Sequence, residues 1–151
     1  MSQATEKDYL RHAVMTATPE QLQLMLYDGV IRYASQAKSA LESNDYEASH
    51  DRLTRAQNIM LEMQSGLNYD VNPALCRKIA SVYNFLYRKL IDANVHRDLQ
   101  AVDDALKVLR IERETWRILV DKVGRMRPAG PSNEEEFTPA AECPTGFTAE
   151  V

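Results

Sequence analysis

A carboxylate and an imidazole stand three residues apart in Glu47-Ala48-Ser49-His50, a spacing that places both on one face of a helix. Di-iron helical bundles use two such Glu-x-x-His motifs together with two further inward glutamates. This chain has one such motif, at the start of an expected helix. A surface histidine next to a glutamate that the helix dipole stabilises is therefore the favoured interpretation, and a metal site is the weaker alternative.

The other residue types that could do chemistry are scattered. His12 and His96 fall in an N-terminal arm and in a loop, and Asp103-Asp104 is best explained as the solvated face of a helix. The sequence contains no Gly-rich phosphate loop, no paired-cysteine motif and no Ser/His/Asp pattern. We therefore expect a protein that is not an enzyme and that uses no cofactor or metal.

Composition excludes further classes. The 151 residues carry a net charge of −4 and are 44% hydrophobic, which suits one domain with a substantial core. Nucleic-acid binding needs a clustered positive surface, whereas this body is near-neutral with both signs mixed. The sequence has no apolar run of about 18 residues for a membrane span and no secretory signal, and its two cysteines are too few for a disulfide framework. We expect a cytoplasmic protein.

Apolar residues recur at helical spacing and predict an all-α fold. Thr18 and Gln21 form a capping box around Pro19. Asn72 is likewise a capping residue that stands directly before a proline, Pro73. Asn44 with Glu47 resembles a further capping box, and Gly124 is a natural residue to follow a helix. Because the connections are short, neighbouring helices should be antiparallel. The prediction is an up-down four-helix bundle over 18–124, with helices at about 19–43, 45–66, 73–95 and 98–123.

The two ends of the chain differ from this body. Residues 1–17 form an N-terminal arm that can hold a short helix around Tyr9–Val14. Residues 125–151 are acidic and rich in Pro and Gly, a composition typical of disorder. An appendage without a packed core is the favoured interpretation of this tail, and a short partner-binding motif at Phe137 or Phe147 is the alternative.

Two of the predicted helices carry more apolar residues than one buried stripe requires. The additional positions are Leu24, Tyr27 and Ile31 in the first helix, and Tyr83, Tyr87 and Ile91 in the third. Neighbouring helices and the arm could cover these stripes, or they could line grooves for an amphipathic helix of a partner. A dimer interface is the third alternative. The residues alone leave all three open.

Several motifs spread over residues 9–117 resemble, in their order, those of the FliS family of flagellar secretion chaperones. They are Thr16-Ala17-Thr18-Pro19-x-x-Leu22-x-Leu24-Met25-Leu26-Tyr27-Asp28-Gly29 preceded by Tyr9; Ala56-Gln57-Asn58-Ile59-Met60; Val82-Tyr83-Asn84-Phe85-Leu86-Tyr87-Arg88-Lys89-Leu90-Ile91-Asp92-Ala93-Asn94; Asp98; and Glu114-Thr115-Trp116. Arg110-Ile111-Glu112-Arg113 is more basic than the family pattern, and the tail after Gly124 has no counterpart in it.

The resemblance implies a cytoplasmic export chaperone that binds the disordered C-terminal segment of flagellin. Such a chaperone prevents premature polymerisation and keeps flagellin competent for flagellar type III export. In the family the N-terminal arm can lie over the groove, so Tyr9 and its neighbours are expected to shield Tyr27 and Ile31. The expected partner-binding residues are Tyr9, Leu10, Val14, Leu24, Tyr27, Ile31, Tyr83, Tyr87 and Ile91.

Two further expectations concern assembly. The chain should be a monomer or a weak homodimer, and the flagellar export gate is a candidate second partner. The alternative function is a self-associating helical adaptor or structural bundle without a flagellin client.

Overall fold

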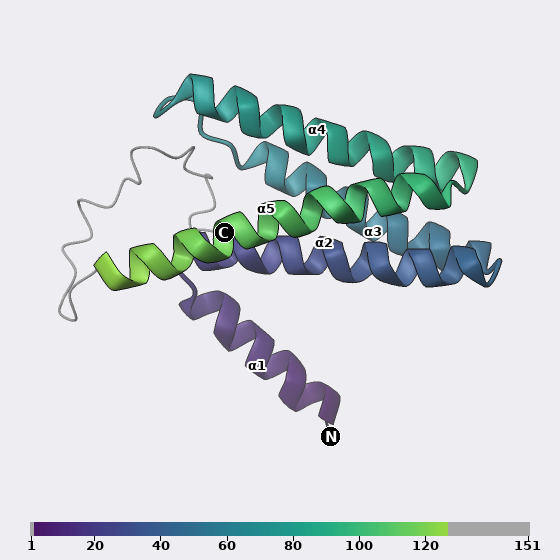
Figure 1. Ribbon diagram of the computed structural model, residues 1–151. Helices are drawn as coiled ribbons and strands as arrows, with labels where there is room; N and C mark the ends of the chain where they lie inside the picture. Colours follow the sequence, from purple (N-terminus) through teal and green to yellow (C-terminus); the bar gives the residue numbers. More distant parts are fainter. Residues whose placement is uncertain (1, 127–151) are drawn as a thin grey trace.

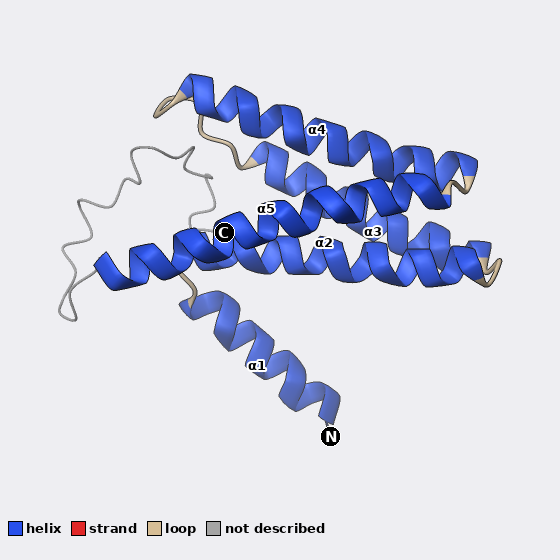
Figure 2. Cartoon of the chain, in the orientation of Figure 1, coloured by secondary structure: helices blue, strands red, loops and turns tan. Residues whose placement is uncertain are grey.

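The computed structural model describes residues 2–126, and its regular elements in that range are helices (Figure 2). They are α1 (Ser2–Thr16), α2 (Pro19–Glu42), α3 (Tyr46–Ser65), α4 (Pro73–His96) and α5 (Leu99–Met126). The all-α prediction is confirmed for this part of the chain. Of the predicted disordered tail 125–151, residues 127–151 lie outside the described residues.

Helices α2 and α4 begin at the caps that the sequence predicts. The Gln21 backbone N–H donates to Thr18 Oγ1 over 3.2 Å, and the Thr18 N–H donates to Gln21 Oε1 over 2.9 Å. Asn72 Oδ1 accepts the Leu75 N–H over 3.2 Å. These side chains satisfy N–H groups that have no partner within the helix.

Two predicted boundaries need correction. Helix α3 is capped by Asp45, whose carboxylate accepts the Ala48 N–H over 3.2 Å, while Asn44 turns the chain with a φ of 57°. Asn tolerates this left-handed conformation better than most residues, so it serves the turn and leaves the cap to Asp45. Helix α5 continues through Gly124 to Met126, and the buried Val123 holds its last turns against the bundle.

Helices α2 to α5 form the antiparallel bundle, and α1 leaves it at the start of α2 (Figure 1). Each helix of the bundle packs beside two of the others, in the cyclic order α2, α3, α4, α5. Side-chain contacts fix the register of the pairs. They are Lys38–Asp103 (2.8 Å) and Asp28–Arg113 for α2 and α5, Tyr33–Arg55 for α2 and α3, Gln57–Asn94 (3.1 Å) for α3 and α4, and Lys89–Asp104 (3.4 Å) for α4 and α5.

The two ends of the bundle are packed by side chains of different size. One end contains the α2–α3 and α4–α5 connections, and the buried side chains toward it combine leucines and a valine with small alanines: Leu41, Leu53, Leu90, Val102 and Leu106, and Ala34, Ala37, Ala56, Ala93, Ala101 and Ala105. The other end is filled by Tyr27, Met60, Met63 and Tyr83. Small side chains let helices approach closely and large ones hold them apart, because interiors are close-packed. Figure 1 shows α4 and α5 close at their connection and diverging from there. We call these ends the narrow end and the wide end.

The capping box of α2 can be tested by Thr18→Ala. Loss of the side-chain acceptor should lower the free energy of unfolding by about 1 kcal/mol, as measured in urea with an unchanged m value. Thr115→Ala is the control, since this exposed hydroxyl bonds only to Ile111 O within its own helix. The control should change stability by less than about 0.5 kcal/mol. Equal losses in both variants would contradict a specific role for the cap.

Candidate functional site

The core of the wide end contains a polar cluster formed by Gln23, Tyr27 and Tyr83, all with 0% exposure. The Gln23 side-chain amide donates to the Tyr83 hydroxyl, and the Tyr27 hydroxyl lies 3.5 Å from that of Tyr83. The two rings meet edge to face with centroids 6.4 Å apart. Gln23 Oε1 is buried and has no hydrogen-bond partner among the described residues. This cluster joins α2 to α4 across the diagonal of the bundle.

Tyr27 and Tyr83, which were expected to line a groove, are fully buried in the free chain. Both side chains belong to its hydrophobic core. The sequence pattern could not distinguish the two situations, because a Tyr at helical spacing suits either a core or a groove. Their rings meet edge to face inside the wide end of the bundle.

Burial also changes the ionisation of the cluster. Desolvation raises the pKa of Tyr83 to about 12. The pKa of Tyr27 is raised as well, first by desolvation and then by the adjacent Tyr83. Glu112, which is half-buried nearby, has its carboxyl pKa raised by desolvation. The phenols are therefore neutral over the physiological range, so this site acts through packing and hydrogen bonds rather than through charge.

Leu24 and Ile31 lie on the side of α2 that faces α5. Asp28 and Lys38, which pair with α5 residues, are one or two helical turns away from them on the same face. Both apolar side chains are half-buried, and Ile31 packs against the core. They form an apolar part of the line of contact between α2 and α5, which we call the α2–α5 seam; the other pairs of neighbouring helices have seams in the same sense.

Tyr87 and Ile91 lie on the side of α4 that faces α3. Asn94, one turn beyond Ile91, donates to Gln57 Oε1 of α3 over 3.1 Å. Both side chains are half-buried. The α3–α4 seam is on the opposite side of the bundle from the α2–α5 seam, so the two predicted stripes do not meet in a single groove.

The N-terminal arm does not cover either seam. It is a 15-residue helix, and Tyr9, Leu10 and Val14 are 72%, 47% and 43% exposed. In Figure 1, α1 diverges from the bundle along its length. The expected shielding of Tyr27 and Ile31 by the arm is therefore absent from this structure. Tyr27 is covered instead by core neighbours, among which are Tyr83 and Trp116.

Sequence reasoning missed apolar residues on the outside of α4 and α5. Phe85 is 42% exposed, and Ile111 and Ile118 are 64% and 43% exposed. The Lys89–Asp104 pair sets a register in which Phe85 is level with Val108, beside the α4–α5 seam. The seven-residue spacing of Ile111 and Ile118, opposite the buried spine of α5, was the signal in the sequence.

The residues first considered for chemistry lie apart from one another. His50 is exposed, with Nδ1 3.0 Å from Asn94 Oδ1. Asp103 and Asp104 each pair with a lysine. Across residues 2–126, no three His, Cys, Asp or Glu side chains gather as they would around a metal. None of the helices in that range is long and apolar enough to cross a membrane.

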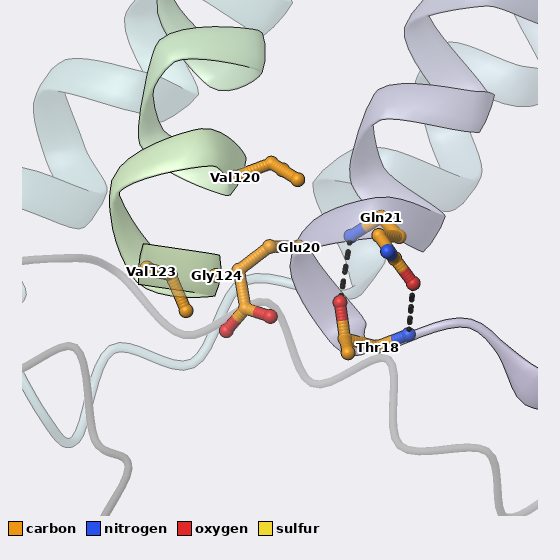
Figure 3. A pocket seen from close by; sticks show the side chains of 6 residues that line it. All are labelled: Thr18, Glu20, Gln21, Val120, Val123 and Gly124. Carbon is orange, nitrogen blue, oxygen red and sulfur yellow. Dashed lines mark hydrogen bonds between the residues drawn. The ribbon is translucent and has the colours of Figure 1, made fainter. Parts of the chain in front are cut away.

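A small pocket joins the start of α2 to the end of α5. Figure 3 shows its lining: the capping residue Thr18 with Glu20 and Gln21 of α2, and Val120, Val123 and Gly124 of α5. Glu20 is only 5% exposed, and its carboxylate lies beside the last turn of α5. The start of α2 and the end of α5 are therefore in contact at the wide end of the bundle.

The buried polar cluster can be tested by Tyr83→Phe. This change removes the acceptor of the Gln23 amide and leaves a buried donor unpaired, which should cost about 1–3 kcal/mol in urea unfolding. The double variant Gln23→Met/Tyr83→Phe removes both polar partners and should lose less than Tyr83→Phe alone. The single variant Gln23→Met completes the comparison. If the double variant loses as much unfolding free energy as the two single variants together, the assigned hydrogen bond is contradicted.

Alkaline stability provides a second test. The Tyr83 pKa is raised in the folded state, so the neutral phenol stabilises the fold fully below pH 10. This contribution should be lost as the pH rises from about 10 to about 12, where the unfolded chain releases the proton first. The unfolding free energy of Tyr83→Phe should therefore fall less steeply over this range. Tyr69→Phe, at a 45% exposed site, should follow the unchanged protein.

Comparisons with known proteins agree with this architecture. The family model described as flagellar protein FliS matches residues 1–123. The flagellar secretion chaperone FliS of Bacillus subtilis is 32% identical over 109 residues, covering 72% of this chain and 80% of that protein. The Salmonella typhimurium protein of the same name is 31% identical, covering 73% and 82%. A solved structure titled as a bacterial flagellar chaperone has a TM-score of 0.66 at 17% identity and covers 81% of this chain and 99% of its own, a likeness in fold. The chain belongs to the FliS family.

Proposed function

We propose that this protein is a cytoplasmic export chaperone that binds the C-terminal segment of flagellin, prevents its premature polymerisation and keeps it competent for flagellar type III export. The observation that carries this proposal is the family match over residues 1–123, together with relatives named flagellar secretion chaperones. The flagellar export gate is proposed as a second partner.

The geometry supports a client on the outer surfaces of the bundle. The core is complete without a partner, since Tyr27, Tyr83 and their neighbours are already buried. Apolar side chains that retain exposed area lie along the helix seams, and grooves of this kind receive the apolar face of an amphipathic helix. We retain Leu24, Ile31, Tyr87 and Ile91 as proposed seam contacts, and Tyr9, Leu10 and Val14 as proposed contacts of α1.

Ordering a disordered client on these seams costs about 2–5 kcal/mol of the gross interaction energy. That cost suits an export chaperone, because the complex must dissociate before the client is exported. The exposed helix α1 can then add contacts with the client. A 15-residue helix with little packing is only marginally stable in water.

The proposal predicts that binding depends on the flagellin C-terminal segment. Purified protein should retain full-length flagellin and should bind flagellin lacking that segment at least tenfold more weakly, measured by titration calorimetry. The segment buries its apolar face on the bundle, so removing it removes the interaction. Equal affinity for both forms of flagellin would refute the proposed client site.

Single substitutions should identify the seam that is used. Leu24→Asp places a charge in the α2–α5 seam, and Tyr87→Asp places one in the α3–α4 seam. Gln36→Asp is the matched control on the exposed face of α2. Variants that remain helical and cooperative in unfolding are then compared for flagellin binding. A tenfold loss, about 1.4 kcal/mol, in one seam but not in the control would locate the contact.

Sedimentation of the protein without a client distinguishes the proposed chaperone from the alternative, a self-associating bundle. A monomer or weak dimer is expected. A tight dimer whose formation protects Tyr87 and Ile91 would favour the structural alternative.

A further inference from the structure

The outer face of α4 carries three basic side chains that form no ion pair with any described residue. They are Arg77, Lys78 and Arg88, all exposed. Arg77 and Arg88 are about three helical turns apart on one line, and the 42% exposed ring of Phe85 lies beside that line. We call these four residues the basic strip. Lys89, by contrast, pairs with Asp104.

The start of α4 adds to this positive potential. Its first turn contains no acidic residue, so the partial positive charge of the helix N-terminus is not compensated there. The end of α5 differs, because Arg125 in its last turn offsets the partial negative charge of the helix C-terminus. The start of α4 itself attracts an acidic segment.

The sequence beyond the family match supplies a segment of complementary chemistry. Residues 127–151 contain five Glu and one Arg, and three of the Glu are consecutive in Glu134-Glu135-Glu136-Phe137. This run combines carboxylates with an aromatic ring, as the basic strip combines cations with Phe85. We propose that Glu134–Phe137 docks on the basic strip of the same chain.

The chain is long enough for this contact. Helix α5 ends at the wide end of the bundle, where α4 begins (Figure 1). The Lys89–Asp104 register places Arg77 level with Trp116, ten residues before Met126 and so about 15 Å back along α5. The ten residue steps from Met126 to Glu136 span up to about 35 Å, which is more than twice this axial distance. The remaining length allows a lateral reach of about 30 Å between the diverging helices.

The contact is weak and dependent on salt. Exposed ion pairs contribute little each and are screened over about 8 Å at physiological ionic strength. The short tether raises the local concentration of the segment to the millimolar range, which is sufficient for substantial occupancy. A partner that needs the basic strip must displace the segment, so its apparent affinity falls by about two- to tenfold. The segment is thus a built-in competitor for acidic partners of α4.

Amide chemical shifts of the full-length ¹⁵N-labelled protein test the proposal. In 50 mM salt, Arg77→Gln/Lys78→Gln/Arg88→Gln should shift the amides of Glu134–Phe137 relative to the unchanged protein. The difference should disappear in 500 mM salt. The control variant Lys122→Gln/Arg125→Gln removes two cations from the last turns of α5 and should leave those amides unchanged.

Three results would overturn the proposal. In the first, the α4 variant leaves the amides of 134–137 within a line width of their original positions. In the second, the control variant shifts them equally. In the third, the difference fades on dilution, which means that the segment occupies a second copy. None of these measurements uses flagellin, so their outcome is independent of the client proposed above.

Discussion

The difference in side-chain size between the two ends of the bundle is the constraint on which the rest of the structure depends. The buried alanines lie in the narrow half beside leucines such as Leu53 and Leu90, and Tyr27, Tyr83 and two methionines lie in the wide half. At native packing density a larger side chain needs a larger spacing between helices. The divergence of α4 from α5 toward the wide end agrees with this gradient (Figure 1).

The tyrosines at the wide end bring polar groups into the core. A purely apolar filling of the same volume would avoid the buried Gln23 carbonyl, which is left without a partner among the described residues. The hydrogen bond from Gln23 to Tyr83 links α2 to α4 across the diagonal of the bundle.

Charge pairs determine the register of α5 on its neighbours. Arg113 interrupts the apolar spine of α5, and the structure explains the interruption, because its guanidinium pairs with Asp28 of α2. Asp103 pairs with Lys38 of α2, and Asp104 pairs with Lys89 of α4. These consecutive aspartates therefore point to different helices. Individually these exposed pairs add little stability, but they favour one register over its alternatives.

The sequence by itself determined the helices, their order and most of their starts. Helical periodicity and caps such as Thr18 and Asn72 are local properties, so they can be recognised without knowledge of the neighbours. The motifs also identified the family. Only the tertiary structure decided which apolar residues are core and which are surface. Tyr27 and Ile31 are one turn apart, yet one is fully buried and the other retains exposed area. Their difference depends on residues of α4 and α5 far away in the chain, and no pattern within one helix contains that information.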